Sequence, residues 1–335
     1  MPPPREFTEL LAIARGYQRS QALAVAARLR VADLLATGPQ TAAELARSTG
    51  THAPTLYRLL RALSSIGVFT ELTGQSFENS ALSEYLRSDH ALSVAPTVEM
   101  FCGDYEWTAW GALDHSVRTG ENAATHALGM DVWEHRRLNP DAGSTFDAAM
   151  RTLSRANDDE VGAHDFGSFA VIADIGGGTG ALLSAILREH PQQRGILFDQ
   201  PHVVENAAPV LAAAGVEERV EVVGGSFFES VPTGADAYVL RRILHDWTDE
   251  QCVEILQCLR RAMAPAARLL VIDAVVGAPN EDPLAKWLDL MMLVSAGGRE
   301  RTIEEWVAVL ADGGFRLVST AAATASTNVI VAAPL

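Results

Sequence analysis

A histidine and an aspartate stand a few residues after an apolar segment that has the length of a β-strand. His245 and Asp246 follow residues 237–240. Histidine can take a proton from a hydroxyl group near neutral pH. Asp273 lies near the end of the next apolar segment, and Glu300 follows in a stretch that begins with two glycines. Because two carboxylates beside one imidazole fix its orientation and stabilise its charged form, these residues predict a general base with two acidic partners.

A glycine-rich segment, Gly176-Gly177-Gly178-Thr179-Gly180, lies between a predicted strand and a predicted helix. Glycines let the backbone turn tightly and approach a ligand closely. This spacing also fits a dinucleotide-binding loop, which is a weak signal when it stands alone. Asp174, just before the glycines, suits a cationic amino acid and sulfonium, whereas Asp199 could bind ribose hydroxyls of either cofactor. The pattern therefore favours S-adenosylmethionine (SAM) over nicotinamide, with a glycine turn that binds nothing as the alternative.

Strands and helices alternate from about residue 168 onward, which predicts a mostly parallel sheet covered on both faces. Ligands of such sheets bind at the carboxyl ends of the strands. An isolated His-Asp pair is more often part of an exposed turn. Here, however, His245 and the glycine segment both follow carboxyl ends of predicted strands, and this shared position favours a catalytic role for His245. The predicted strands are 171–175, 195–198, 220–223, 237–240, 269–276, 315–319 and 328–332, and the predicted helices are 181–188, 202–214, 249–263 and 303–311.

The N-terminal part of the chain, residues 7–100, has helical periodicity and the features of a small winged helix. Thr41 and Glu44 form a predicted capping box, and residues 68–72 and 76–78 form a predicted two-stranded wing. This arrangement can bind DNA or serve as a dimer-forming scaffold. Arg58 and Arg61 are the only cations of the second helix, which favours the scaffold.

Composition excludes several classes of function. The 335-residue chain has a formal net charge of −16, which disfavours binding to phosphate backbones. Hydrophobic residues make up 48%, yet the apolar runs are too short to span a membrane, and the N-terminus does not resemble a signal peptide. Three cysteines lack metal or disulfide spacing. We expect a cytoplasmic protein with no nucleic-acid or membrane partner and no metal.

Several of these segments together resemble the small-molecule O-methyltransferases of plants and bacteria, which act on phenolic natural products. The resemblance spans nearly the whole chain. It is carried by the winged segment, residues 146–150, the glycine segment, Phe198-Asp199, His245-Asp246-Trp247 and residues 297–302. It implies an α/β fold: a Rossmann-like SAM methyltransferase domain at 166–335, preceded by a mainly helical winged-helix dimerisation domain at 1–100 and a helical linker at 101–165. It further implies a homodimer, a small aromatic substrate and S-adenosylhomocysteine as product.

The resemblance also assigns roles to individual residues. His245 is the implied general base, and Asp273 and Glu300 are its flanking carboxylates. The residues implied to bind SAM are Asp174, Gly176, Gly178, Asp199, Ser226, Phe227 and Arg241. The residues implied to contact the aromatic acceptor are Phe146, Met150, Asp246, Trp247 and Met292.

The chain departs from the family pattern at a few positions. Asp273 stands where many relatives have glutamate, and Ser226 where many have an aspartate near the adenine amine. Residues 291–296 are one residue shorter than in plant members, which is more typical of bacterial secondary metabolism, such as antibiotic biosynthesis. The alternatives are methylation of nitrogen or carbon, a decarboxylation or hydroxylation on the same fold, a nicotinamide enzyme and a DNA-binding regulator. The acceptor itself stays open.

Overall fold

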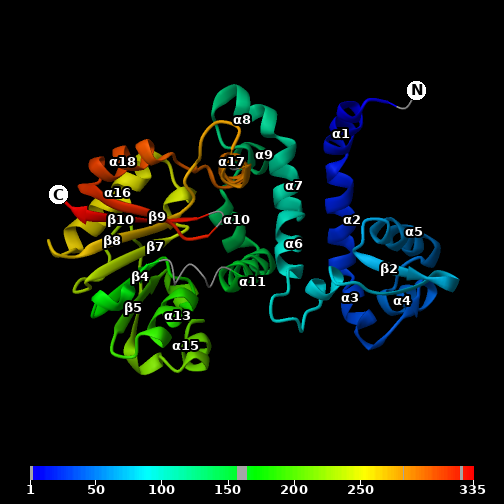
Figure 1. Cartoon of the computed structure of the whole chain (residues 1–335), viewed down its shortest axis with the longest axis horizontal. Helices are drawn as coiled ribbons and strands as arrows, with labels where there is room; N and C mark the ends of the chain where they lie inside the picture. Colours follow the sequence, from blue (N-terminus) through cyan, green and yellow to red (C-terminus); the bar gives the residue numbers. More distant parts are fainter. Residues whose placement is uncertain (1–2, 157–163, 282, 325–326) are drawn as a thin grey trace. The chain divides into compact units, whose positions relative to one another are not determined.

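The computed structural model describes residues 3–156, 164–281, 283–324 and 327–335. The chain forms two compact units (Figure 1). The first unit comprises Met1–Thr108 and Trp133–Ala156, and the second comprises Ala109–Val132 and Asn157–Leu335. The predicted boundaries at residues 100 and 165 stay predictions.

A three-stranded antiparallel sheet and short helices form the winged part of the first unit. The sheet order is β1-β3-β2, and the predicted wing and the Thr41–Glu44 capping box are both confirmed. Side chains such as Leu45, Leu60 and Phe77 are completely buried in the core of this part. Its elements are α3 (Val31–Leu34), β1 (Gln40–Thr41), α4 (Ala42–Thr49), α5 (Ala53–Ser64), β2 (Phe69–Leu72) and β3 (Ser76–Asn79).

Longer helices complete the first unit, with α6 packed against both α2 and α11. The helical character predicted for residues 95–165 is confirmed as far as residue 156, and residues 157–163 lie outside the described chain. The helices are α1 (Arg5–Ala14), α2 (Gly16–Arg28), α6 (Ala95–Phe101) and α11 (Pro140–Ala156), with most of α7 (Asp104–Gly111) and of α10 (Val132–Leu138), which each cross a boundary between the units.

A sheet of seven described strands forms the centre of the second unit, in the order β6-β5-β4-β7-β8-β10-β9. The first five of these strands are parallel, and β10 runs antiparallel to both β8 and β9. The strands are β4 (Val171–Ile175), β5 (Arg194–Asp199), β6 (Val220–Gly224), β7 (Ala237–Arg241), β8 (Arg268–Asp273), β9 (Phe315–Ala322) and β10 (Asn328–Pro334).

Helices cover both faces of this sheet, as the alternating pattern predicts (Figure 1). One core contains buried side chains of α16 and α18, and the other contains those of α13 and α15. The prediction of one continuous helix at 202–214 is wrong. The helix breaks after Val204, because the ring of Pro209 would clash with the carbonyl of Glu205. The helices are α13 (Ala181–Glu189), α14 (Pro201–Val204), α15 (Ala208–Ala214), α16 (Asp249–Ala262) and α18 (Ile303–Asp312).

The remaining helices of the second unit are α8 (Leu113–Thr119), α9 (Ala123–Leu128) and α17 (Pro283–Met291), which continues into a π-helix, Met292–Ala296. The strand predicted at 269–276 ends early, at Asp273, and Val275 instead pairs with Arg301 in an isolated bridge. Among the described residues, no helix is long and apolar enough to cross a membrane.

Candidate active site

Four parallel strands end along one edge of the large sheet, and we call this edge the carboxyl rim. They are β4, β5, β7 and β8, which end at Ile175, Asp199, Arg241 and Asp273. The glycine segment follows β4, and His245 follows its neighbour β7. The structure therefore brings the predicted cofactor loop and the predicted base onto the same rim.

The glycine segment adopts a backbone that requires glycine. Gly176 and Gly178 have φ angles of 72° and 61°, a region that residues with a Cβ atom rarely adopt. A Cβ atom on Gly176 would lie 2.5 Å from Cδ1 of Ile243. The Gly176 amide donates to the carbonyl of Phe198 at 2.7 Å, and the Gly178 amide donates to Oδ2 of Asp199 at 2.8 Å. These bonds fix the loop against the end of β5.

Asp174 is a buried carboxylate beside this loop, with 2% of its surface exposed. Burial raises its pKa to about 7, while the Arg241 cation lowers the pKa and the Asp199 carboxylate raises it further. Within the described chain, Oδ2 of Asp174 has no hydrogen-bond partner. A Cβ atom on Gly177 would lie 2.6 Å from this oxygen. Since a buried acceptor without a donor is costly, the site fits a ligand ammonium group such as the amino-acid end of SAM.

Asp199 ends β5 and already accepts two main-chain hydrogen bonds. Its Oδ2 accepts from Gly178, and its Oδ1 accepts from the amide of Gln200 at 2.6 Å. Asp199 lies at the end of β5 on the carboxyl rim, and its contact with ribose hydroxyls stays a prediction.

Three aromatic rings pack together between the loop after β6 and the segment after β7. The Trp247 ring lies edge-on to the rings of Phe227 and Phe228, at centroid distances of 5.9 and 4.9 Å. Trp247, which the sequence predicts to contact the acceptor, thus packs against Phe227, which it predicts to contact adenine. The hydroxyl of Ser226 accepts from the Phe228 amide at 3.3 Å, a turn contact that leaves its own predicted role in adenine binding untested.

His245 meets carboxylates through both of its ring nitrogens. Its side chain is buried, with 7% of the residue exposed. Nδ1 lies 2.6 Å from Oε1 of Glu300 and 3.8 Å from Oδ1 of Asp273, and Nε2 lies 3.6 Å from Oδ1 of Asp246. The two predicted partners therefore share Nδ1. Nε2 has Asp246 as a third carboxylate nearby.

The carboxylates dominate the electrostatics of this cluster. Burial disfavours the His245 cation, but Asp273, Asp246 and Glu300 outweigh burial and raise the pKa of His245 to about 10. Burial raises the pKa of Asp273 above its ordinary value, although the His245 cation acts in the opposite direction. Both oxygens of Asp273, and Oε2 of Glu300, lack hydrogen-bond partners among the described residues. The cluster thus stabilises the charged, imidazolium form of His245.

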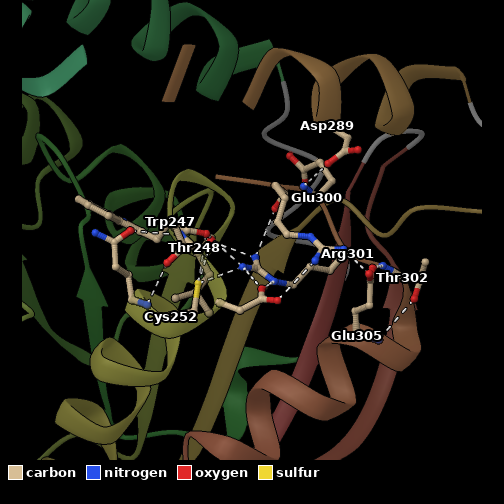
Figure 2. Close-up of polar contacts among 12 residues, drawn as sticks. Trp247, Thr248, Cys252, Asp289, Glu300, Arg301, Thr302 and Glu305 are labelled. Atoms are coloured by element: carbon tan, nitrogen blue, oxygen red, sulfur yellow. Dashed lines mark hydrogen bonds and ion pairs between the residues drawn. The ribbon is translucent and has the colours of Figure 1, made fainter. Parts of the chain in front are cut away.

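Residues 297–302 position Glu300 against His245. The Glu300 amide donates to Oδ1 of Asp289, in α17, at 2.9 Å (Figure 2). The Arg299 amide donates to the carbonyl of His245 at 2.9 Å. A Cβ atom on Gly298 would lie 2.0 Å from that same carbonyl oxygen. Only glycine at position 298 allows the two segments to approach this closely.

Sequence reasoning missed several residues that support the site. Asn122 caps α9, and its Nδ2 donates to the carbonyls of Leu293 and Val294 in the π-helix, at 2.8 and 3.1 Å. Asp289 and Arg301 were likewise not singled out. Asn122 precedes a run of small residues, which is a signal for a helix cap only. Nothing in the sequence indicates that Asp289 and Arg301 contact residues close to His245.

The residues predicted to contact the acceptor lie in both units. Met292 is buried in the π-helix of the second unit. Phe146 and Met150 lie in α11 of the first unit, where the Arg136 guanidinium stands 3.3 Å from the centroid of the Phe146 ring. Their contact with an acceptor stays a prediction. No group of three or more His, Cys, Asp or Glu among the described residues could hold a metal ion.

We expect the two acidic partners of Nδ1 to contribute unequally to kcat. Glu300→Gln removes a charged hydrogen bond and should lower kcat, measured in the high-pH limit where His245 is neutral, by about 10–10². Asp273→Asn should lower kcat by less, because its oxygen is 3.8 Å away, and should change the acceptor KM little. Steady-state kinetics of both variants and of the double variant test this. The double loss should be smaller than the sum of the single losses in free energy. Full additivity would show that the two residues act independently.

Comparison with known proteins gives the family. The family description "O-methyltransferase domain" matches residues 110–316, and "O-methyltransferase dimerisation domain" matches residues 11–89. The chain is 41% identical to phenazine O-methyltransferase of Lysobacter antibioticus over 97% of this chain and 96% of that protein. It is also 41% identical to 8-amino-8-demethylriboflavin N,N-dimethyltransferase of Streptomyces davaonensis, over 95% of this chain and 94% of that one.

A solved structure also matches this fold. The O-methyltransferase of neocarzinostatin biosynthesis, in complex with SAM and 2-hydroxy-5-methyl naphthoic acid, matches with a TM-score of 0.84 and 34% identity, over 94% of this chain and 96% of that chain. The carboxyl rim, with its glycine segment and buried Asp174, and the two family matches lead to one conclusion. The chain belongs to the SAM-dependent O-methyltransferase family.

Proposed function

We propose that this enzyme methylates a hydroxyl group of a small aromatic secondary metabolite, phenolic or of polyketide type, with His245 as general base. One observation carries the proposal. Nδ1 of His245 is engaged by Glu300 at 2.6 Å, so that Nε2 faces away from that carboxylate on the carboxyl rim. A histidine held through one nitrogen by a carboxylate presents the other nitrogen as the proton acceptor.

Each residue of the site has a separate role in the proposed methyl transfer. Glu300 and Asp273 hold the imidazole in orientation and stabilise its positive charge. As the acceptor oxygen attacks, its O–H bond breaks and the proton passes to Nε2 of His245. Bound SAM supplies an electrophilic methyl group on a sulfonium, and the product is S-adenosylhomocysteine. Asp174, with its buried unpartnered Oδ2, and the glycine segment would hold the amino-acid end of SAM, while Asp199 would hold its ribose.

The class of acceptor follows from the relatives and from the site. Phenazine and naphthoic acid, named for two of the relatives, are flat fused aromatics. A phenol hydroxyl has a pKa near 10, so a base contributes to its methylation near neutral pH. These observations support a phenolic acceptor of bacterial secondary metabolism.

Methylation of an aromatic amine is the second candidate, because one relative is by name an N,N-dimethyltransferase of 8-amino-8-demethylriboflavin. A neutral arylamine already carries a lone pair and needs no base before it attacks. The presence of a buried His245 with its carboxylates therefore favours oxygen. An amine substrate would make His245→Ala nearly as active as the wild type.

A screen of acceptors tests the proposed function. Phenols, hydroxynaphthoates, hydroxyphenazines and matched arylamines are incubated with SAM carrying a deuterated methyl group, and products are read by mass. We expect a mass increase on phenolic acceptors, abolished by addition of excess S-adenosylhomocysteine. Transfer to arylamines alone would support the second candidate and contradict the first.

We further propose that the chain is a homodimer assembled through its first unit, and this supplies a separate prediction. The dimerisation family matches residues 11–89, and α1 exposes Phe7, Leu10 and Ile13 by 55, 69 and 74%. Burying such side chains against a second copy is favourable.

Leu10→Glu combined with Ile13→Glu should shift sedimentation toward monomer. The control is Val318→Glu on β9, which is also exposed and should leave the dimer intact. An unchanged dimer in the double variant would exclude α1 from the interface.

We also propose that the enzyme has no nucleic-acid or membrane partner. The net charge of −16 supports the absence of nucleic-acid binding, and we propose that the enzyme works in the cytoplasm without a membrane partner.

A further inference from the structure

We propose that Arg301 is a positioning residue that holds the main chain on either side of His245 and thereby sets the position of the imidazole. The proposal rests on the proposed role of His245 as base. Arg301 is completely buried and lies directly after Glu300 in the chain. The geometry points to an indirect role, because its guanidinium contacts main-chain carbonyls, Cys252 and Asp249 (Figure 2).

The guanidinium bonds to both ends of the segment that contains His245. Its Nη1 donates to the carbonyl of Leu244 at 3.0 Å, and its Nη2 donates to the carbonyl of Trp247 at 3.1 Å. The carbonyl between them, that of His245, accepts from the Arg299 amide at 2.9 Å. Residues 244–246 form a single 3-10 turn, closed by the Trp247 amide, which donates to the Leu244 carbonyl at 3.4 Å. Residues 299 and 301 add donors to the carbonyls of this short turn and of Trp247.

Two further contacts fix the guanidinium itself. Oδ1 of Asp249, at the start of α16, accepts from Nε at 2.9 Å and lies 2.7 Å from Nη2. The face of the guanidinium lies over the buried Trp306 ring, 5.2 Å from its centroid. Cys252 adds a bond to the same turn, since its thiol donates to the Leu244 carbonyl at 3.1 Å. Burial raises the pKa of Cys252 to about 12, so the thiol stays a donor.

Consecutive residues explain how one short segment can act on both the side chain and the main chain of His245. Val276 donates to the carbonyl of Arg301 at 2.9 Å, which continues a strand-like bridge. In extended chain, successive side chains point to opposite sides. Glu300 therefore reaches the imidazole, while Arg301 reaches the carbonyls beneath it. The distance between Nδ1 and Oε1 depends on both side chains together.

Arginine is needed here for its shape as well as its charge. A guanidinium carries five N–H donors in a planar fork, whereas a lysine ammonium donates from a single atom. Lysine at position 301 keeps the charge but cannot bond to the Leu244 and Trp247 carbonyls and to Asp249 in the same geometry. Arg301→Lys thus separates position from electrostatics.

The chain offers a matched control in Arg219. Its guanidinium donates to the carbonyls of Leu187, His190 and Gln193, at 2.9, 3.3 and 3.0 Å. These carbonyls lie at the end of α13 and just before β5, which is the amino edge of the sheet. Arg219→Lys therefore removes a similar set of main-chain bonds at the edge opposite to the carboxyl rim.

The experiment follows the titration of His245 by NMR with ¹⁵N-labelled histidine, its signals assigned by their loss in His245→Asn. Thermal unfolding and kcat with 1-naphthol as probe acceptor are measured in parallel. We expect both lysine variants to unfold at lower temperature. Only Arg301→Lys should lower the pKa of His245 from about 10 by at least one unit, because the imidazole moves away from Glu300. Its kcat in the high-pH limit, where His245 is neutral, should fall by about 10–10². The rise of kcat/KM with pH should begin at lower pH than in the wild type, and the KM for SAM should stay within two-fold.

A purely structural Arg301 would give the opposite result: Arg301→Lys would lose stability as Arg219→Lys does, with the His245 titration unchanged. Asp249→Asn provides a second variant if Arg301→Lys does not fold, since it weakens the guanidinium's anchor at a half-exposed side chain. It should lower the His245 pKa and the high-pH limit of kcat by smaller amounts, and a wild-type titration would overturn the proposal. Failure of the proposed function is distinguishable, because it would leave His245→Ala active without altering the titration test.

Discussion

His245→Ala is expected to lower kcat by about 10²–10³, the usual cost of losing a general base. Affinity for SAM should hardly change, because the residues proposed to bind SAM are contributed by other strand ends. The measurement is kcat with the best phenol from the screen, together with titration calorimetry of S-adenosylhomocysteine. The loss should shrink for a nitrophenol, whose hydroxyl is already largely ionised near neutral pH. An equal loss for acidic and weakly acidic phenols would show that His245 positions the acceptor without taking its proton.

The pKa of His245 also predicts how this activity depends on pH. A base must be neutral before it accepts a proton, and a pKa of about 10 keeps most of the imidazole charged at pH 7. The neutral fraction therefore grows as pH rises, and kcat/KM, which reports ionisations of the free enzyme, should increase between pH 6 and 9. His245→Ala should retain only the part of this increase that follows ionisation of the phenol. A wild-type profile that is flat above pH 7 would contradict the raised pKa.

Asp174→Asn is expected to have opposite effects on binding and on stability. Loss of a charged hydrogen bond to the amino-acid end of SAM should weaken SAM binding by about 10–10² in Kd. The burial that raises the pKa of Asp174 to about 7 means that its ionised form destabilises the fold. This cost grows from pH 3.8 toward pH 7 and is fully present above pH 7. Asparagine removes it and should raise the free energy of unfolding, without SAM, by on the order of 2–4 kcal/mol at pH 8.

Urea unfolding at pH 8 and pH 5 measures the stability change, and calorimetry measures binding. The gain should be smaller at pH 5, where Asp174 is already mostly protonated. Asp312→Asn, at the exposed end of α18, is the control and should change neither quantity. A destabilised Asp174→Asn with unchanged SAM affinity would place Asp174 in a purely structural role.

The sequence predicted those parts of the site that depend on strand ends. Asp199 and Asp273 each lie at the carboxyl end of a short apolar run, and parallel strands necessarily place such ends on one rim. The glycine segment was predictable because it directly follows such a strand end. The wing at 68–78 was predictable because turn residues separate two short apolar segments. Local periodicity and chain order were sufficient for all of these features.

Features that depend on contacts between distant segments could not be predicted. Asn122 donates to carbonyls of residues 293 and 294, which are about 170 positions away in sequence. Arg301 is charged and follows a charged residue, which in sequence is typical of an exposed position. Its burial depends on hydrogen bonds to the carbonyls of residues 244 and 247, which approach position 301 only in the folded chain. The break between α14 and α15, in contrast, has a local signal in the sequence, because Pro209 cannot lie inside a continuous helix.

The way in which the chain divides between its two units bears on recombination of this enzyme with its relatives. Residues 133–156 belong with residues 1–108, although 109–132 belong with the second unit. A chimera with one crossover near residue 100 would therefore join α11, with Phe146 and Met150, to a foreign first unit. Exchange of the whole first unit between relatives calls for two donor segments, 1–108 and 133–156, inserted together. Libraries built with crossovers at 108, 132 and 156 should yield more folded enzymes than libraries cut once.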